Sequence, residues 1–198
     1  GYDKTKYYCD SNPDVCLSID NCPNHVLLAA KGDEAKDALI RELESKQIFH
    51  YILPFQSGFH TPFIMDRMAK VREAFNAIEM LQNSIPVWSS TSLTPYISHK
   101  EDFINQVVDH LTKPLHFNQL INKLHEEENA RVFIQVGVGK MIDFVDDILK
   151  NKQYSSISSA SSERSGIEQL RRILALLYIE GKEIDYNFLG VKVLYQIS

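Results

Sequence analysis

The pentapeptide Gly58-Phe59-His60-Thr61-Pro62 decides how the chain is interpreted. Thr61 followed by Pro62 predicts a helix start, because a threonine hydroxyl can cap a helix and proline is tolerated at its first position. A strand predicted over residues 48–55 places His60 at a strand-to-helix junction, where α/β sheets expose reactive groups. Imidazole is suited to proton transfer near neutral pH. The residues alone leave two interpretations of His60 open, a catalytic base and a histidine with a structural role.

The chain after His60 has the pattern of an α/β layer architecture, in which helices alternate with short strands. Apolar residues at steps of three and four predict an amphipathic helix from Thr61 to about Leu81. Further helices are expected near residues 103–111, 115–124, 141–149 and 167–177, and strands near 86–91 and 131–136. Residues 155–165 are rich in serine, which fits either a flexible linker or a strand followed by a loop, and we prefer the second.

The chain before His60 predicts a smaller α+β unit. Two apolar runs, at residues 15–20 and 25–30, flank the turn-rich Asn21-Cys22-Pro23-Asn24 and indicate a hairpin. A helix over 33–45 and the strand over 48–55 would follow. Strand, strand, helix and strand make up most of a ferredoxin-like unit, whose remaining strand and helix we expect before Gly1.

The composition of the chain argues against two classes of binding partner. The chain has 198 residues, 44% hydrophobic and 24% charged, with a net charge of −5, and it lacks a cluster of basic residues. That composition is typical of a globular protein and disfavours nucleic acid or an anionic membrane as partner. No run of 18 apolar residues occurs, and residues 1–20 lack a signal-peptide pattern. Cys9, Cys16 and Cys22 fit no zinc spacing, so we expect free thiols, a reducing compartment and a cytoplasmic location.

Other candidate motifs are weak. Gly137-Val138-Gly139-Lys140 lacks the residues that surround a Walker loop and is interpreted as a tight turn. Ser57 does not lie in a G-x-S-x-G elbow and is rejected as a nucleophile. Asp143, Asp146 and Asp147 are interpreted as a solvated helix face. The remaining six histidines show no two-ligand metal motif, so no metal site is expected.

The order of motifs from about Tyr7 to Gly190 resembles the acyl-CoA:acyl-carrier-protein acyltransferase domains of polyketide synthases and polyunsaturated-fatty-acid synthases. The resemblance rests on six matches, each followed by the family pattern in parentheses: Asn21-Cys22-Pro23 before Val26-Leu27-Leu28-Ala29 (N-x-P, V-V-I-S-G); Phe59-His60-Thr61-Pro62 (F-H-S/T-P); Pro86-Val87-Trp88-Ser89-Ser90 (P-V-x-S-N); Leu111 with Pro114-Leu115-His116-Phe117 (L-x-x-P-V-x-F); Phe133-Ile134-Gln135-Val136-Gly137 (F-x-E-V-G-P); and Gly181 with Ile184-Asp185-Tyr186 (G-x-x-V-D-W).

The resemblance implies a fold and a set of site residues. The expected fold class is α/β, with a partial ferredoxin-like subdomain over residues 1–57 and the C-terminal half of an α/β-hydrolase-like core over residues 58–198. His60 would be the catalytic base, held in one tautomer by a backbone carbonyl near His110. Phe59 and His110 would contact substrate. Because malonyl-selective members carry phenylalanine at the position of Phe59, malonyl is the expected acyl group.

The resemblance also implies substrates and partners. Acyl-CoA and the phosphopantetheine of an acyl carrier protein would be substrates, no cofactor would be tightly bound, and neighbouring synthase domains would be partners. The family's nucleophilic serine would precede Gly1, so this piece alone should be inactive. Two alternatives stay open, a non-catalytic docking module of a multidomain synthase and a thioesterase-like hydrolase. The predicted ferredoxin-like unit disfavours the hydrolase.

Overall fold

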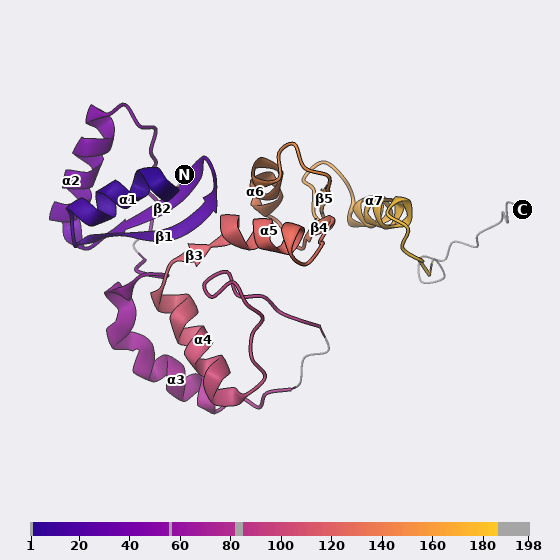
Figure 1. Ribbon diagram of the computed structural model, residues 1–198, viewed down its shortest axis with the longest axis horizontal. Helices are drawn as coiled ribbons and strands as arrows, with labels where there is room; N and C mark the ends of the chain where they lie inside the picture. Colours follow the sequence, from indigo (N-terminus) through magenta and orange to yellow (C-terminus); the bar gives the residue numbers. More distant parts are fainter. Residues whose placement is uncertain (1, 56, 82–84, 186–198) are drawn as a thin grey trace, which may run out of the picture. The chain divides into compact units, whose positions relative to one another are not determined.

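The computed structural model describes residues 2–55, 57–81 and 85–185 (Figure 1). Helices and short strands alternate along these residues, so the predicted mixed α/β class is confirmed. The chain divides into two compact units, Gly1–Glu128 and Asn129–Ser198. No helix in the described ranges is long and apolar enough to cross a membrane.

The first unit is built on a three-stranded sheet with the order β2-β1-β3. β1 (Val15–Cys22) and β2 (His25–Ala30) pair antiparallel, which confirms the predicted hairpin (Figure 1). The short strand β3 (Leu115–His116) lies parallel to β1 and pairs with Ile19 and Asp20. Residues about a hundred positions apart in the sequence therefore meet in this sheet.

Two helices pack on the hairpin and bury its apolar side chains. α1 (Tyr2–Ser11) was not predicted from the sequence, whereas α2 (Gly32–Ser45) is the helix expected over residues 33–45. Tyr8 of α1, Val15 of β1 and Ala35 of α2 form one buried cluster. The first unit thus gains one part of its core from the sheet and from both helices.

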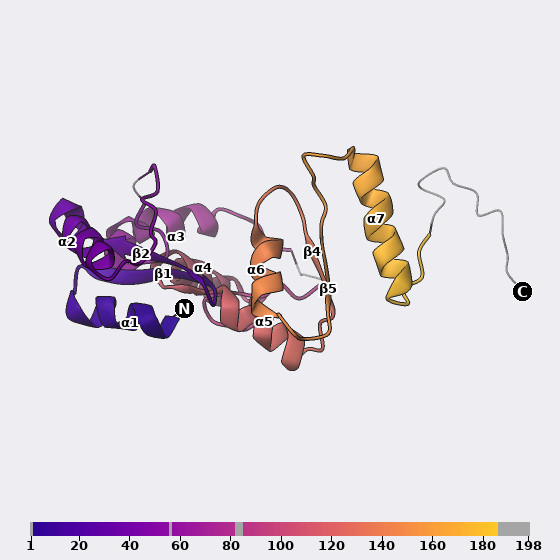
Figure 2. The same ribbon diagram turned by 90° about the horizontal axis from the view of Figure 1, so that it is seen from above.

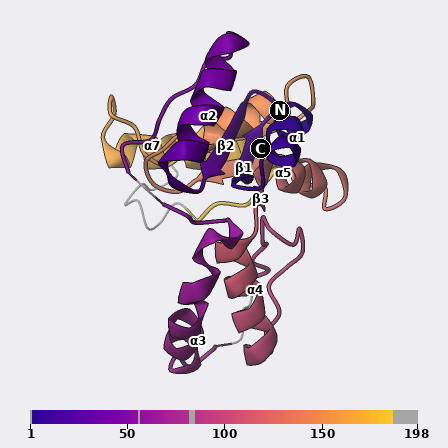
Figure 3. The ribbon, with the colours of Figure 1, turned by 90° about the vertical axis from the view of Figure 1, so that its left-hand side faces the viewer.

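A second cluster lies between the helices that follow His60. The predicted single helix from Thr61 to Leu81 is instead a 3₁₀ helix, η1 (Pro62–Arg67), continued by α3 (Met68–Asn76). α3 runs beside α4 (Lys100–Thr112), as Figure 3 shows. Ile64, Met68 and Val108 form the buried centre of this pair. The helix ends before Leu81 because that side chain is 79% exposed and gains too little from packing to stabilise a further turn.

Two predicted strands are absent among the described residues. Residues 48–55 contain no strand, because their backbone groups have no neighbouring strand to pair with. Residues 86–91 contain only an isolated bridge between Trp88 and Pro95. In that segment the Ser89 hydroxyl accepts from the backbone N–H groups of Thr91 and Ser92, which forms a turn instead of a strand.

The last helix of the first unit is α5 (Phe117–Glu126), which packs on β1. The second unit, seen from another side in Figure 2, has two parallel strands, β4 (Val132–Gln135) and β5 (Ser155–Ser158), with α6 (Met141–Ile148) against both. α7 (Gly166–Ile179) follows, and its first turn is capped by Ser165. The preferred interpretation of the serine-rich segment, a strand and then a loop, is confirmed by β5.

Candidate active site around His60

The segment before His60 is a tight turn that depends on a glycine. A Cβ atom added to Gly58 would lie 2.7 Å from Cγ2 of Ile64, a distance that side chains do not tolerate. The Thr61 hydroxyl donates to the Gly58 carbonyl at 2.6 Å and accepts from the Phe63 N–H at 3.2 Å. Thr61 is wholly buried. This side chain therefore closes the turn and caps η1 at the same time, as Thr61-Pro62 predicted.

His60 is bound to the C-terminal end of α4 by two hydrogen bonds. Its backbone N–H donates to the Leu111 carbonyl at 2.7 Å, and its ring Nδ1 lies 2.6 Å from the His110 carbonyl oxygen. These two carbonyls belong to the last turn of α4, where no further helical N–H is available to them. The φ angle of His60 is +63°, a left-handed conformation that is unusual for a residue other than glycine. The two bonds hold the residue in this conformation.

The bond to the His110 carbonyl determines which ring nitrogen of His60 carries the proton. A carbonyl oxygen can only accept, so Nδ1 must be the donor. In the neutral ring, Nε2 then keeps its lone pair and is the atom that can take a proton. The family resemblance implied a carbonyl near His110 for this purpose, and the His110 carbonyl lies within hydrogen-bond distance of Nδ1.

The side chain of His110 lies against the ring of His60. The two ring centroids are 5.1 Å apart with an interplanar angle of 80°. Burial lowers the pKa of His110, and the neighbouring His60 lowers it further. His110 is therefore neutral at neutral pH, since each cause disfavours its charged form.

Phe59 places an aromatic ring next to His60. The two ring centroids are 6.4 Å apart, and Phe59 is 56% exposed. Its carbonyl accepts a hydrogen bond of 3.0 Å from the buried hydroxyl of Ser18 on β1. The structure thus brings together all three predicted site residues, Phe59, His60 and His110. Ser18, which anchors them to the sheet, carries no signal in the sequence.

Two nearby groups that could act as nucleophiles are unsuited to that role. Burial raises the pKa of Cys16 to about 11, and Cys9 adds to the rise while a hydrogen bond with Thr61 opposes it. Cys16 is therefore a neutral thiol at neutral pH. The Ser57 oxygen accepts from the Phe59 backbone N–H at 3.2 Å, which is a local turn contact.

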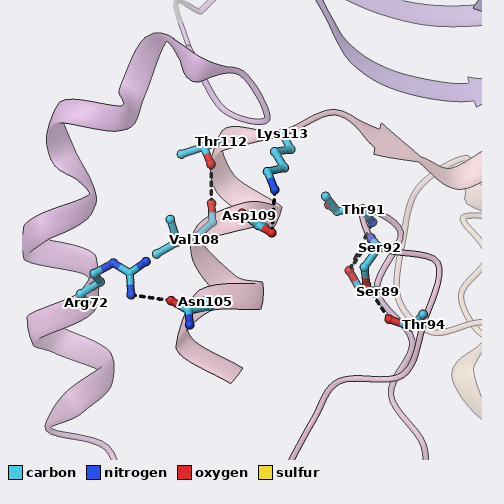
Figure 4. Close-up of polar contacts among 10 residues, drawn as sticks. All are labelled: Arg72, Ser89, Thr91, Ser92, Thr94, Asn105, Val108, Asp109, Thr112 and Lys113. Carbon is cyan, nitrogen blue, oxygen red and sulfur yellow. Dashed lines mark hydrogen bonds and ion pairs between the residues drawn. The ribbon is translucent and has the colours of Figure 1, made fainter. Parts of the chain in front are cut away.

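Polar contacts fix α4, the helix that holds His60. Figure 4 shows the Arg72 guanidinium on α3 donating to Asn105 at 2.8 Å, which ties the two helices together. At the end of α4 the Thr112 hydroxyl donates to the Val108 carbonyl at 2.7 Å. These contacts define the position of the last turn, and so of the carbonyls that His60 uses.

The glycine-rich loop after β4 is a closed turn. The Gln135 side-chain amide donates to the carbonyls of Gly137 and Gly139 at 3.2 and 3.1 Å, and its oxygen accepts from the Ile142 N–H at 2.8 Å. Since Gln135 is buried, its amide is satisfied entirely by the loop and by the start of α6. This agrees with the interpretation of the loop as a tight turn. The sequence of this segment did not indicate that Gln135 holds the loop closed.

Other features of the described residues add no second site. No group of three or more His, Cys, Asp or Glu side chains there could hold a metal ion. A cavity of about 420 Å³ lies at the start of α4, some ten residues and roughly 15 Å along the helix from His110. It is lined by Arg72, Asn76, His99, Lys100, Glu101 and Ile104, and includes none of the predicted site residues.

Known proteins resemble this chain over most of its length, although no family model matches it. The malonyl CoA-acyl carrier protein transacylase of Bacillus subtilis is 26% identical over 160 residues, covering 79% of this chain and 49% of the relative. Probable polyketide synthase 23 of Dictyostelium discoideum is 23% identical over 191 residues, covering 88% of this chain and 8% of the synthase. The chain thus spans about half of the transacylase and a small part of the synthase.

Solved structures share the fold. The malonyl CoA-acyl carrier protein transacylase of Clostridium perfringens superposes with a TM-score of 0.77 at 19% identity, over 91% of this chain and 55% of that one. The acyltransferase domain from the second module of the salinomycin polyketide synthase superposes with a TM-score of 0.79 at 17% identity, over 93% of this chain and 43% of that one. The resemblance predicted from the motifs is confirmed: the chain is a relative of the malonyl-CoA:acyl-carrier-protein transacylases and of polyketide synthase acyltransferase domains.

Proposed function

We propose that this chain is the base-carrying part of an acyltransferase that moves an acyl group from CoA to the phosphopantetheine thiol of an acyl carrier protein. The observation that carries the proposal is the 2.6 Å contact between Nδ1 of His60 and the His110 carbonyl. This contact leaves Nε2 as the proton acceptor, without the aspartate that orients histidine in many hydrolases. The two transacylases and the acyltransferase domain named above are acyl-transferring proteins by their own descriptions.

The reaction would proceed in two halves with a covalent intermediate. A serine hydroxyl attacks the thioester carbonyl of acyl-CoA while Nε2 of His60 takes the hydroxyl proton. The carbon–sulfur bond breaks, the proton passes to the CoA sulfur, and an acyl-serine remains. The phosphopantetheine thiol then loses its proton to Nε2 and attacks the acyl-serine, and the serine regains a proton. We propose that this serine belongs to a segment outside these 198 residues.

The site residues suggest the acyl group and its contacts. The exposed ring of Phe59 beside His60 would face the α-carbon of the acyl group and leave little room for a methyl branch. Malonyl is therefore the proposed substrate. The neutral His110 ring, which packs on His60, would form a second wall of the substrate site.

The proposal extends to organisation and partners. Residues 1–57 would be part of a ferredoxin-like subdomain and residues 58–198 part of an α/β-hydrolase-like core, in a synthase whose neighbouring domains and carrier protein are the partners. The reaction needs no tightly bound cofactor, because its substrates carry the thioester and the thiol. Three free cysteines support a reducing, cytoplasmic location.

The test is replacement of His60 in a polypeptide that also contains the serine-bearing half. His60→Ala should lower the rate of enzyme acylation by malonyl-CoA about 10²–10⁴-fold, the usual loss for a general base. His99→Ala is a matched control, because that histidine is exposed at the start of α4, where its ring pairs with Asp102. A structural His60 predicts the opposite outcome, a large loss of stability with near-normal activity in the protein that still folds. Retention of more than about a tenth of the rate would refute the assignment.

A second measurement uses the 198-residue chain alone. Without a serine opposite His60, the chain should form no ester with radiolabelled malonyl-CoA. Label that survives denaturation in stoichiometric amount would contradict the proposed division of the catalytic residues.

A further inference from the structure

Ser18 of β1 holds one end of the peptide group that joins Phe59 to His60. Its hydroxyl donates to the Phe59 carbonyl at 3.0 Å, while the N–H at the other end of this peptide group donates to the Leu111 carbonyl at 2.7 Å. Ser18 is only 7% exposed, so its hydroxyl has little access to water as an alternative partner. Hydrogen bonds at both ends of the peptide group fix the orientation of its plane.

Ser18 is the extra residue of a β-bulge. Leu17 and Ile19 of β1 face consecutive residues of β2, Leu28 and Leu27, which leaves Ser18 without an opposite residue in the hairpin. Insertions of this kind re-aim a side chain and are frequent beside active sites. Here the re-aimed hydroxyl reaches a carbonyl that lies 41 positions further along the chain. The irregularity in the hairpin is therefore linked to the turn that carries His60.

The same strand is joined to the other side of the site by strand pairing. Ile19 and Asp20 of β1 pair with Leu115 and His116 of β3, the strand that follows α4. This pairing uses backbone groups and does not involve the Ser18 hydroxyl. Removal of the hydroxyl should therefore leave β1 and the end of α4 in place, and should release only the peptide group before His60.

We propose that Ser18 is a positioning residue that keeps Nδ1 of His60 on the His110 carbonyl. The φ angle of His60 is +63°, in a region that disfavours residues other than glycine. Without the Ser18 hydroxyl the peptide group can rotate, which returns φ to a negative value and changes the direction of the His60 side chain. The 2.6 Å contact with the His110 carbonyl is then lost, and with it the preference for the tautomer whose Nε2 accepts a proton.

Nitrogen NMR of histidine-labelled protein measures the tautomer in the polypeptide that also contains the serine-bearing half. The signals of His60 are those that disappear in His60→Ala. In the wild-type protein Nδ1 should carry the proton of the neutral ring, whereas in Ser18→Ala the form protonated at Nε2 should predominate. Ser18→Thr keeps the hydroxyl and should keep the proton on Nδ1. This measurement does not depend on the proposed function, whereas the effect on catalysis rests on it.

The rate of enzyme acylation by malonyl-CoA should follow the tautomer. Ser18→Ala should lower this rate about fivefold to tenfold, the effect of one lost hydrogen bond, and Ser18→Thr should stay within about twofold of the wild-type protein. Val15→Ala is a matched control, because Val15 is buried on the same strand and packs with Tyr8 and Ala35. It should lower stability and leave the tautomer and the rate unchanged. Circular dichroism verifies folding, which is expected for Ser18→Ala because alanine is smaller than serine.

The outcomes separate the positioning role from the proposed function. An unchanged tautomer in Ser18→Ala would overturn the proposal whatever its acylation rate, as would an equal change in Val15→Ala. A changed tautomer with an unchanged rate would refute the role of Ser18 in catalysis. If the tautomer changes in Ser18→Ala but the wild-type polypeptide forms no acyl-enzyme, Ser18 still positions His60 and the proposed function is wrong.

Discussion

Replacement of Gly58 by alanine should destabilise the turn that presents His60. The added Cβ would lie 2.7 Å from Cγ2 of Ile64, well inside normal contact distance. Ile64 is only 8% exposed and belongs to the cluster with Met68 and Val108, and its β-branched side chain has few other rotamers. The clash must therefore be relieved by a shift of packed atoms. Overpacking of this kind costs about 1–3 kcal/mol of unfolding free energy.

A second substitution should reverse most of that loss. Ile64→Met removes the methyl branch that causes the clash and places a flexible side chain of similar volume in the same cluster. Alone it should cost less than about 1.5 kcal/mol. In the double variant the two effects should not add, and we expect an interaction energy of about 1–2 kcal/mol in favour of the pair.

Urea denaturation followed by fluorescence gives the measurement. Trp88 is the sole tryptophan and lies in the first unit, so its signal reports the unit that contains Gly58. Gly166→Ala, followed by circular dichroism, is the matched control, because a Cβ there meets no atom within 4 Å. It should change stability by less than about 1 kcal/mol. An unchanged midpoint for Gly58→Ala, or strict additivity in the double variant, would refute the packing argument.

Three further predictions concern Thr61, Leu149 and Cys16. Thr61→Ala should lower the free energy of unfolding by about 1–3 kcal/mol in the same urea titration, because it removes both the cap on η1 and the hydrogen bond to Gly58. Thr61→Ser keeps the hydroxyl and should retain most of the wild-type stability. Leu149→Ala, at a wholly buried position, should cost about 2–5 kcal/mol by circular dichroism, while Val138→Ala at a 92% exposed position should change stability by less than about 0.5 kcal/mol. At pH 8, iodoacetamide should alkylate Cys16 about 100-fold more slowly than a cysteine with the ordinary pKa of 9.0. The rate should rise about tenfold per pH unit up to pH 11, because the thiolate fraction rises in that proportion. Peptide mass spectrometry measures the extent of alkylation.

Local patterns in the sequence predicted the elements whose stability is local. The hairpin of β1 and β2 follows from two apolar runs around Asn21-Cys22-Pro23-Asn24, and α2 from its apolar spacing. The start of η1 follows from Thr61 and Pro62, whose capping requires only neighbouring residues. In each of these elements the hydrogen-bond partners lie close together along the chain.

Elements that depend on distant partners were predicted poorly. Residues 48–55 have the composition of a strand, but strand formation needs a second strand, and a single sequence does not say whether one is present. The helix after His60 ends at Asn76 because α4 covers only part of its apolar stripe, so Ile78 and Leu81 extend past the contact and are exposed. The parallel pairing of β3 with β1 joins residues about a hundred positions apart, and periodicity carries no information about that pairing.

The candidate site likewise combines a residue that a local motif identifies with contacts to residues distant in the sequence. The motif identified His60, but the properties that would make it a base come from elsewhere in the chain: the His110 carbonyl sets the tautomer, the Leu111 carbonyl holds the left-handed backbone, and Ser18 anchors the adjoining peptide. All three contacts use a backbone carbonyl as acceptor, a group that every residue type supplies. The tautomer of His60 is therefore set by the backbone at position 110, while the His110 side chain packs against the His60 ring. The family resemblance thus pointed to the base and to a carbonyl near His110, whereas the contacts with Leu111 and Ser18 are seen only in the fold.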